Sequence, residues 1–275
     1  MKIDAHQHFW NYSATEYGWI NEQMEAIRRD FLPIDLRKEI CQVGVDSVIS
    51  VQARQTLQET RWLLDLAAQN DFIKGVVGWV PLTEPTVRDE LDRLRENPLL
   101  RAVRHVVQDE PDGYLLRKDF NAGISVLRET GLAYDLLIYE RQLPEATRFV
   151  DQHPQQVFVL DHLAKPQIKE NVVDPWRQRI RELARRENVY CKVSGLVTEA
   201  HFSAWTEEQL FPYLETALEA FGPSRLMFGT DWPVCLLACP YQRWYEVVSR
   251  FASLSPDEQA SLFGNTAARA YGLVA

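Results

Sequence analysis

Eight short apolar segments alternate with helical segments along the chain, and this alternation predicts an α/β fold of the (β/α)8, or TIM, barrel type. Most of these segments are continuous apolar runs, which is typical of strands buried on both faces of a parallel sheet. The 275 residues suit such a barrel, which commonly takes about 250 residues as one unit. An open, doubly wound sheet is the alternative, but no glycine-rich turn follows the first strand. We therefore expect a single barrel domain over residues 1–275, without a linker or repeat.

The first strand is expected at residues 2–10 and is followed by a long polar segment, residues 11–33. Aromatic residues such as Tyr17 and Trp19 are spread through this segment. Loops longer than about 12 residues are unusual unless they form lids or binding loops. We expect this segment to act as a lid and to distort the barrel after its first strand.

The other strands and the helices follow from apolar, β-branched runs and from helix stop signals. The strands are expected at residues 46–52, 73–80, 100–107, 133–139, 156–161, 189–194 and 225–230. The helices are expected at residues 36–43, 58–70, 85–97, 118–130, 143–152, 175–187, 207–221, 241–251 and 256–263. Gly131 directly follows one helix, at the position where glycine commonly ends a helix, and Pro98 stops another.

The composition restricts the class of partner. A formal charge of −9 and a pI near 5.3 argue against nucleic acid, because Lys and Arg carry most of the affinity for phosphates. No segment approaches the roughly 18 apolar residues of a membrane-spanning helix, and the early first strand leaves no room for a signal peptide. Four scattered cysteines, Cys41, Cys191, Cys235 and Cys239, are expected to be free thiols. We expect a cytoplasmic monomer or homodimer with a small-molecule partner.

Polar side chains collect at the carboxyl ends of the predicted strands, where active sites of such barrels lie. They are contributed by six strands: His6 and His8, Gln52, Arg104 or His105, His162, Ser194, and Asp231. His6 and His8 are two residues apart, so in a strand they share one face and can converge on one ion or one substrate oxygen. Asp231 follows the last strand, which becomes a neighbour of the first strand only if the sheet closes.

The positions of other polar residues predict the direction of their side chains or a structural role. Arg104 and His105 are adjacent, so only one can face inward, and we expect Arg104 because the residues two positions away on its side are apolar. Asp135 lies near the start of its strand, which suits a buried structural hydrogen bond at least as well as catalysis. His153 and His201 lie in connections between elements and are expected at the surface.

Three runs of residues resemble the amidohydrolase superfamily: His6-Gln7-His8, Leu160-Asp161-His162-Leu163-Ala164-Lys165-Pro166, and Phe228-Gly229-Thr230-Asp231-Trp232-Pro233. Within it they resemble the branch of sugar-lactone and pyrone-lactone hydrolases, most closely enzymes of the L-fuconolactonase and L-rhamnonolactonase type. The resemblance extends over essentially the whole chain, including residues 50–53, 104–105 and 192–196. It implies a TIM barrel that hydrolyses a sugar lactone to the aldonic acid. The implied substrate is L-fuconolactone or a stereochemically related lactone.

The sequence departs from the metal-rich members of this superfamily. Those members resemble one another in a bridging carboxylated lysine or glutamate at strand four or five, and in histidines that end strands five and six. Here strand four offers Arg104-His105, strand five offers Tyr139, and only His162 of the histidine pair is present. We therefore do not expect a two-metal site.

A single zinc ion on His6, His8 and Asp231 is chemically reasonable, because catalytic zinc usually takes three protein ligands and keeps one position open. The branch that the chain resembles has members that need no metal. We therefore expect a site that can hold one zinc ion without strictly requiring a cofactor.

The predicted mechanism is hydrolysis of the lactone ring ester. Asp231 would act as general base on a water and then return the proton to the departing ring alkoxide. His6, His8, His162 and Arg104 are the candidates to stabilise the developing oxyanion. Six polar or aromatic residues are expected to bind the sugar: Gln52, Lys165, Ser194, Trp10, Trp79 and Trp232. For each tryptophan, ordinary packing at the barrel mouth is an equal alternative.

Two rival functions remain at this point. A metal-dependent decarboxylase of an aromatic or unsaturated acid on the same fold would depend strictly on a divalent ion and release carbon dioxide. A non-catalytic carbohydrate-binding barrel would bind sugar without turnover. The collection of His6, His8, His162 and Asp231 at one mouth argues against the second rival.

Overall fold

A computed structural model describes residues 1–273 and contains one sheet of eight strands in the order β1 to β8, each parallel to the next. The strands are β1 (Ile3–Gln7), β2 (Ser47–Val51), β3 (Ile73–Gly78), β4 (Leu100–Val106), β5 (Ala133–Leu137), β6 (Phe158–Leu160), β7 (Val189–Val193) and β8 (Leu226–Phe228). A parallel bridge between Gln7 and Trp232 brings the two ends of the sheet together. The predicted (β/α)8 barrel is thus confirmed, with a seam between β1 and the residues that follow β8.

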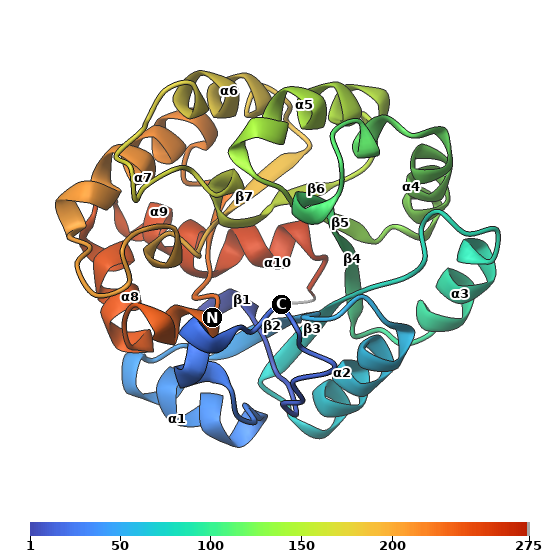
Figure 1. The fold of residues 1–275 in the computed structure, drawn as a ribbon, viewed down its shortest axis with the longest axis horizontal. Helices are drawn as coiled ribbons and strands as arrows, with labels where there is room; N and C mark the ends of the chain where they lie inside the picture. The colour runs from blue at the N-terminus through green and yellow to red at the C-terminus, as the bar shows by residue number, and fades with distance from the viewer. Residues whose placement is uncertain (274–275) are drawn as a thin grey trace.

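Helices alternate with the strands and surround the sheet (Figure 1). They are α1 (Pro33–Val43), α2 (Leu57–Gln69), α3 (Val87–Leu94), α4 (Lys118–Thr130), α5 (Leu143–Gln152), α6 (Trp176–Leu183), α7 (Glu207–Phe221), α8 (Tyr241–Arg250), α9 (Pro256–Ala260) and α10 (Thr266–Ala270). The predicted end of the last helix, residues 256–263, is wrong. The chain continues from α9 through a π-helical turn at Ser261–Asn265 into α10.

Two apolar layers hold the fold together. The larger layer lies between the outer face of the sheet and the helices, and includes Leu63, Phe120 and Trp244. The smaller layer fills the barrel with short or branched side chains from the strands, such as Ala5 and Val77. Filling by small side chains lets strands from all sides of the barrel approach one another, so the interior is a packed core and not a pore.

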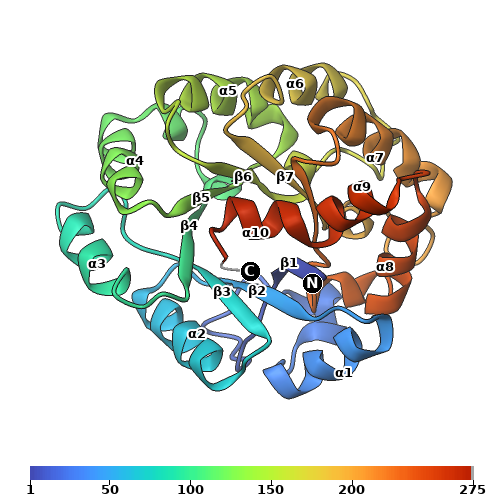
Figure 2. The same cartoon turned by 180° about the vertical axis from the view of Figure 1, so that it is seen from behind.

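Helix α10 closes the amino-terminal end of the barrel (Figure 2). Its residues Ala267 and Ala270, and Tyr271 just after it, pack into the interior layer. The Arg101 guanidinium near the start of β4 donates to the carbonyl oxygen of Gly272 at 3.0 Å. Since this end is covered, the carboxyl ends of the strands form the open mouth.

The segment between β1 and α1 packs on the barrel and contains one short 3-10 helix, Glu22–Ile27. Its two ends are joined by backbone hydrogen bonds between Trp10 and Phe31, at 2.9 and 3.0 Å. Tyr17 and Ile20 are buried within it, which makes it a compact loop with its own small core. Its role as a lid stays a prediction.

The four cysteines are free thiols, as expected, with Cys41 exposed and the other three buried. Over residues 1–273, no helix combines the length and the apolar character that crossing a bilayer would take.

Candidate active site

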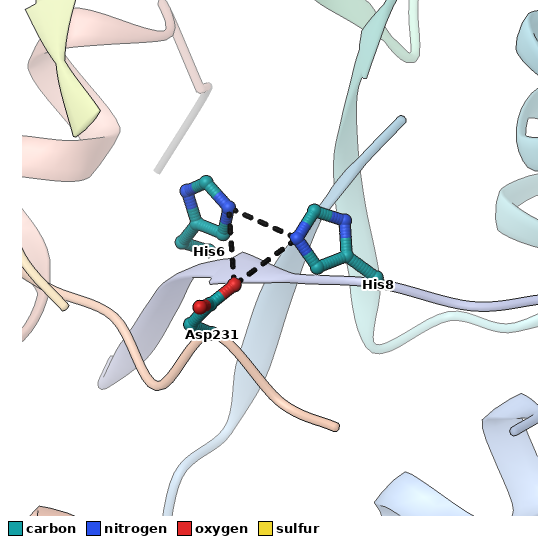
Figure 3. A group of neighbouring side chains, drawn as sticks. All are labelled: His6, His8 and Asp231. Atoms are coloured by element: carbon teal, nitrogen blue, oxygen red, sulfur yellow. Dashed lines mark hydrogen bonds and ion pairs between the residues drawn. The ribbon is translucent and has the colours of Figure 1, made fainter. Parts of the chain in front are cut away.

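His6, His8 and Asp231 bring three polar atoms together at the mouth of the barrel (Figure 3). Nε2 of His6 lies 3.2 Å from Nε2 of His8. Oδ1 of Asp231 lies 3.1 Å from Nε2 of His8 and 3.7 Å from Nε2 of His6. The side chains come from the first strand, from the residue directly after it, and from the residues after the last strand, so closure of the sheet creates this cluster.

A β-bulge in β1 directs these histidines inward. Three steps along β1, from Asp4 to Gln7, match only two steps along β2. Asp4 faces outward, where its carboxylate accepts a hydrogen bond from Tyr241 of α8 at 3.0 Å. Regular alternation would put His6 on the same face as Asp4. The extra residue reverses the face, as bulges beside active sites commonly do, and turns His6 into the barrel.

Asp231 is fixed at the barrel seam by its backbone. Its N–H donates to the carbonyl oxygen of His6 at 2.8 Å, and the next residue, Trp232, accepts from the N–H of His8 at 2.7 Å. Asp231 has a φ of 60°, in the left-handed region that a non-glycine residue seldom adopts. Strained residues of this kind cluster at functional sites.

His162 follows β6 on a second strained segment. Four consecutive residues, from His162 to Lys165, have φ values between 50° and 59°. Each residue in that conformation costs on the order of 1–2 kcal/mol. Nδ1 of His162 lies 2.8 Å from the hydroxyl of Ser194, and Nε2 lies 4.0 Å from Oδ1 of Asp231. A Cβ at Gly195 would lie 2.5 Å from Nδ1 of His162, so only glycine leaves room for the ring.

Arg104 points into the barrel and His105 points out of it, as expected. Nη1 of Arg104 donates to Asp161 at 2.9 Å and lies 3.4 Å from Nε2 of His6. The His105 ring stacks on Tyr114 outside the sheet, with ring centroids 5.0 Å apart.

A layer of buried charges lies directly beneath the histidines. Nζ of Lys192 lies 2.9 Å from Asp161, 3.2 Å from Nδ1 of His6, and also pairs with Asp135. The Tyr271 hydroxyl donates to the Asp135 carboxylate at 2.9 Å, which agrees with a structural role for Asp135. We call Asp135, Lys192, Asp161 and Arg104 the interior charge layer, and His6, His8, His162 and Asp231 the mouth cluster.

The environment sets the charges of the mouth cluster. Burial opposes ionisation of Asp231, but the imidazoles of His162 and His8 and the Lys165 ammonium outweigh it, so the pKa of Asp231 is lowered. Burial lowers the pKa of His162 to about 4. Burial and then the charge of Lys192 hold the pKa of His6 well below its usual range. Near neutral pH, the cluster therefore combines one carboxylate with neutral imidazoles at positions 6 and 162.

The donor set fits a zinc ion. Nδ1 of His8 lies 2.8 Å from the carbonyl oxygen of Val51, which can only accept, so Nδ1 carries the proton and Nε2 presents a lone pair. That lone pair faces the Asp231 carboxylate and Nε2 of His6, so a cation can bind between the three atoms. Tetrahedral zinc with bonds of about 2.0–2.2 Å separates its ligand atoms by about 3.3–3.6 Å. The distances of 3.1–3.7 Å match that arrangement.

A cavity of about 600 Å³ opens above the mouth cluster. His8, His162, Asp231 and Arg104 line its floor, and Lys165 also lines it. The sugar-binding role of Lys165 stays a prediction. The remaining lining residues come from the segment after β1, from the connections after β2, β4 and β8, and from β5: Glu16, Trp19, Ala53, Arg54, Gln55, Thr56, Gln58, Val106, Gln108, Asp109, Leu137 and Val234.

The three tryptophans expected to cover the sugar do not line this cavity. Trp10 is completely buried, and its indole N–H donates to the carbonyl oxygen of Arg29 at 2.8 Å. The Trp79 indole lies outside the sheet and points at His105, 3.4 Å away. Trp232 is buried at the seam. Each of these rings completes the packing around the barrel, so the alternative interpretation holds for all three.

Gln52 and Ser194 are also completely buried and lie away from the cavity lining. Gln52 donates to the carbonyl oxygen of Arg104 at 3.3 Å, and Ser194 contacts His162. The prediction that these two residues contact the sugar directly is therefore wrong. They support Arg104 and His162 instead.

His153 was expected at the surface and is buried instead. Nε2 of His153 lies 2.7 Å from the Asn121 amide oxygen, and its ring packs on Phe149 between helices. His201 is exposed, as expected.

Sequence reasoning missed Asp161, Lys192 and Trp19. A signal existed for the first two: Asp161 directly precedes His162, and Lys192 interrupts an apolar strand, where a charge needs a buried partner. Trp19 lies in an irregular segment, and no periodicity indicated the direction of its side chain.

Comparison with known proteins agrees with this geometry. The family described as Amidohydrolase matches residues 3–273. L-fucono-1,5-lactonase of Burkholderia multivorans is 41% identical over 286 residues, covering 99% of this chain and 96% of that protein. L-fucono-1,5-lactonase of Burkholderia ambifaria is 36% identical over 98% of this chain and 95% of that protein. The crystal structure of an amidohydrolase from Burkholderia multivorans with bound zinc has a TM-score of 0.97, 41% identity and complete coverage of both chains.

Proposed function

We propose that this chain, which belongs to the amidohydrolase family, hydrolyses the ring ester of a sugar lactone to the aldonic acid. The observation that carries the proposal is the Asp231 carboxylate, which is held 3.1 Å from His8 and 4.0 Å from His162 on the floor of the cavity. The similarity to two L-fucono-1,5-lactonases supports L-fuconolactone, or a stereochemically related lactone, as the substrate.

Asp231 acts as the general base. Its lowered pKa keeps it ionised at neutral pH, so it can take a proton from a water that attacks the lactone carbonyl carbon. When the bond between that carbon and the ring oxygen breaks, the protonated Asp231 returns the proton to the ring alkoxide. The new carboxylic acid ionises and releases one proton to solvent for each lactone opened.

His162 and Arg104 stabilise the oxyanion that develops on the carbonyl oxygen. If the Ser194 hydroxyl donates to Nδ1 of His162, then Nε2 carries the hydrogen and faces the cavity as a neutral donor. Arg104 supplies a fixed positive charge at the cavity floor, because Asp161 holds its guanidinium. Both donors are in place before the substrate arrives.

We infer that His6, His8 and Asp231 hold one zinc ion and that turnover does not strictly require it. When bound, zinc polarises the carbonyl oxygen or lowers the pKa of a water. Arg104 already places a cation 3.4 Å from Nε2 of His6, which supplies positive charge beside the cluster without a metal. The cytoplasmic location, the monomeric or dimeric state and the lack of a nucleic-acid partner stay predictions.

Proton release, followed with a pH indicator over a panel of L- and D-aldonolactones, tests the proposal. We expect turnover of L-fuconolactone or a close stereoisomer, and we expect it to survive a strong chelator. Turnover that is lost to chelator and restored by zinc would make the metal essential. No acid release from any lactone, with carbon dioxide released from an aromatic acid, would replace the lactonase by the decarboxylase.

A further inference from the structure

One wall of the cavity is built by two loops that meet above the mouth cluster. The segment after β1 contributes Glu16 and Trp19, and the connection after β2 contributes Arg54. None of these residues belongs to the mouth cluster or to the interior charge layer. The wall therefore lies where the part of a substrate remote from the ring ester would lie.

A single buried carboxylate fixes both loops. Oε2 of Glu59, at the start of α2, accepts the backbone N–H groups of Ala53 and Arg54 at 3.0 and 2.6 Å. Oε1 accepts the hydroxyl of Tyr17 at 3.3 Å. Tyr17 lies between Glu16 and Trp19 in the sequence, so both sides of the wall are tied to the same completely buried group.

Arg54 and Glu16 form an ion pair across the junction of the loops. Nη1 of Arg54 lies 2.7 Å from Oε1 of Glu16, and the guanidinium lies over the Tyr17 ring, 5.0 Å from its centroid. The Arg54 side chain is only 14% exposed, and that exposure is to the cavity. A fixed guanidinium and carboxylate present the donors and acceptors that pairs of neighbouring hydroxyl groups require.

Trp19 supplies an aromatic face beside this pair. The residue stays 40% exposed, which is unusual for a large apolar ring, although it packs on Trp10 in a T-shaped arrangement with centroids 5.7 Å apart. Among the residues that line the cavity, Trp19 is the one tryptophan, and neither tyrosine nor phenylalanine is present there. An exposed, supported aromatic ring in a cavity suits the apolar C–H face of a pyranose-type ring.

We propose that Trp19 and the Arg54–Glu16 pair form a subsite that selects hydroxylated lactone rings, with Trp19 against one ring face and the pair on two neighbouring hydroxyl groups. The proposal deepens the lactonase function and rests on it. It makes these three residues determinants of specificity and leaves the chemistry to the mouth cluster.

The test compares two ring esters, the preferred sugar lactone and δ-valerolactone, which has the same six-membered ester without hydroxyl groups. Trp19→Ala should lower kcat/KM for the sugar lactone about tenfold, and Arg54→Ala about 10- to 100-fold. Both should leave δ-valerolactone hydrolysis within about twofold of wild type. Ile34→Ala and Arg88→Ala are matched controls, since Ile34 is 69% exposed and Arg88 forms an exposed pair with Glu129.

A second probe gives a measurement if δ-valerolactone is hydrolysed too slowly to compare the variants. The 1,5-anhydroalditol of the same sugar keeps the ring and its hydroxyl groups but lacks the ester. Its inhibition constant should rise about tenfold in Trp19→Ala and Arg54→Ala. Equal losses on both esters, or unchanged inhibition by the anhydroalditol, would overturn the subsite and leave the lactonase standing. Wild-type protein that opens no sugar lactone would overturn both.

Discussion

The interior charge layer and the mouth cluster lie next to each other in the barrel, but they differ in how many of their polar atoms are bound by other protein groups. In the interior layer, Lys192 contacts two carboxylates, and Arg104 is held by Asp161 and by the carbonyl oxygen of Gln52. In the mouth cluster, Nδ1 of His8 is bound to Val51 and Nδ1 of His162 to Ser194, and these two rings and Asp231 line the cavity.

This difference separates structure from chemistry at every residue but Arg104, which Asp161 holds in the interior layer and which also lines the cavity floor. Charges whose partners are all supplied by the protein can only be removed at the cost of an unpaired buried group. A group with one atom that faces a cavity can be replaced with little effect on folding, but turnover falls because the reaction needs that group. A substitution confined to one region should therefore change mainly the free energy of unfolding or mainly turnover.

The largest effect on stability is expected from Lys192→Met. This change leaves Asp135 with only the Tyr271 hydroxyl as a partner in a fully buried position, and should lower the free energy of unfolding by about 3–5 kcal/mol. Urea unfolding measures it, with Lys74→Met on the exposed side of β3 as the control. Unfolding within about 1 kcal/mol of wild type would contradict the structural role of the layer.

Glu59 sharpens the comparison, because it is as buried as Asp161 but its ion pair, with Arg54, is longer than those of Asp161 with Lys192 and Arg104. Burial would raise the pKa of Asp161, but Lys192 and then His6 outweigh burial and hold that pKa well below its usual range. The nearest cation to Glu59 is Arg54, whose Nε lies 3.8 Å away, and burial raises the pKa of Glu59 from 4.5 to about 7.

Because the folded-state pKa of Glu59 is above its unfolded value, the contribution of Glu59 to stability is fully present below pH 4.5 and is lost as the pH rises through 7. The expected loss is about 3 kcal/mol. In Glu59→Gln the side chain is neutral at every pH, so the variant should not show this loss of stability. The difference in unfolding free energy, wild type minus variant, should therefore fall by about 3 kcal/mol between pH 4.5 and pH 8. A difference that does not change with pH would refute the assignment.

The smallest effect is expected from Ser194→Ala at the edge of the mouth cluster. Loss of the hydroxyl 2.8 Å from Nδ1 frees the His162 ring and should lower kcat about tenfold. The free energy of unfolding should change by only about 1 kcal/mol. Ser249→Ala, on a helix surface remote from the mouth, is the matched control. A change in stability without a change in kcat would place Ser194 in the structural region instead.

The barrel could be predicted from the sequence because local apolar patterns mark its strands and helix ends. His6, His8 and Asp231 could be predicted because they follow from strand ends once the sheet is closed. The bulge that turns His6 inward leaves no mark in residue type. The pairing of Lys192 with Asp135 joins residues 57 positions apart, and only tertiary packing decides it. The same holds for Trp19, whose direction depends on how an irregular segment folds on the barrel.

The central claim is that Asp231 performs chemistry and does not merely hold the seam. Proton release from the preferred sugar lactone, measured side by side for wild type and Asp231→Asn, tests it most directly. We predict that turnover falls about 1000-fold, while the free energy of unfolding stays within about 1 kcal/mol of wild type, because the backbone bonds at the seam remain. Turnover within a few fold of wild type would contradict the account.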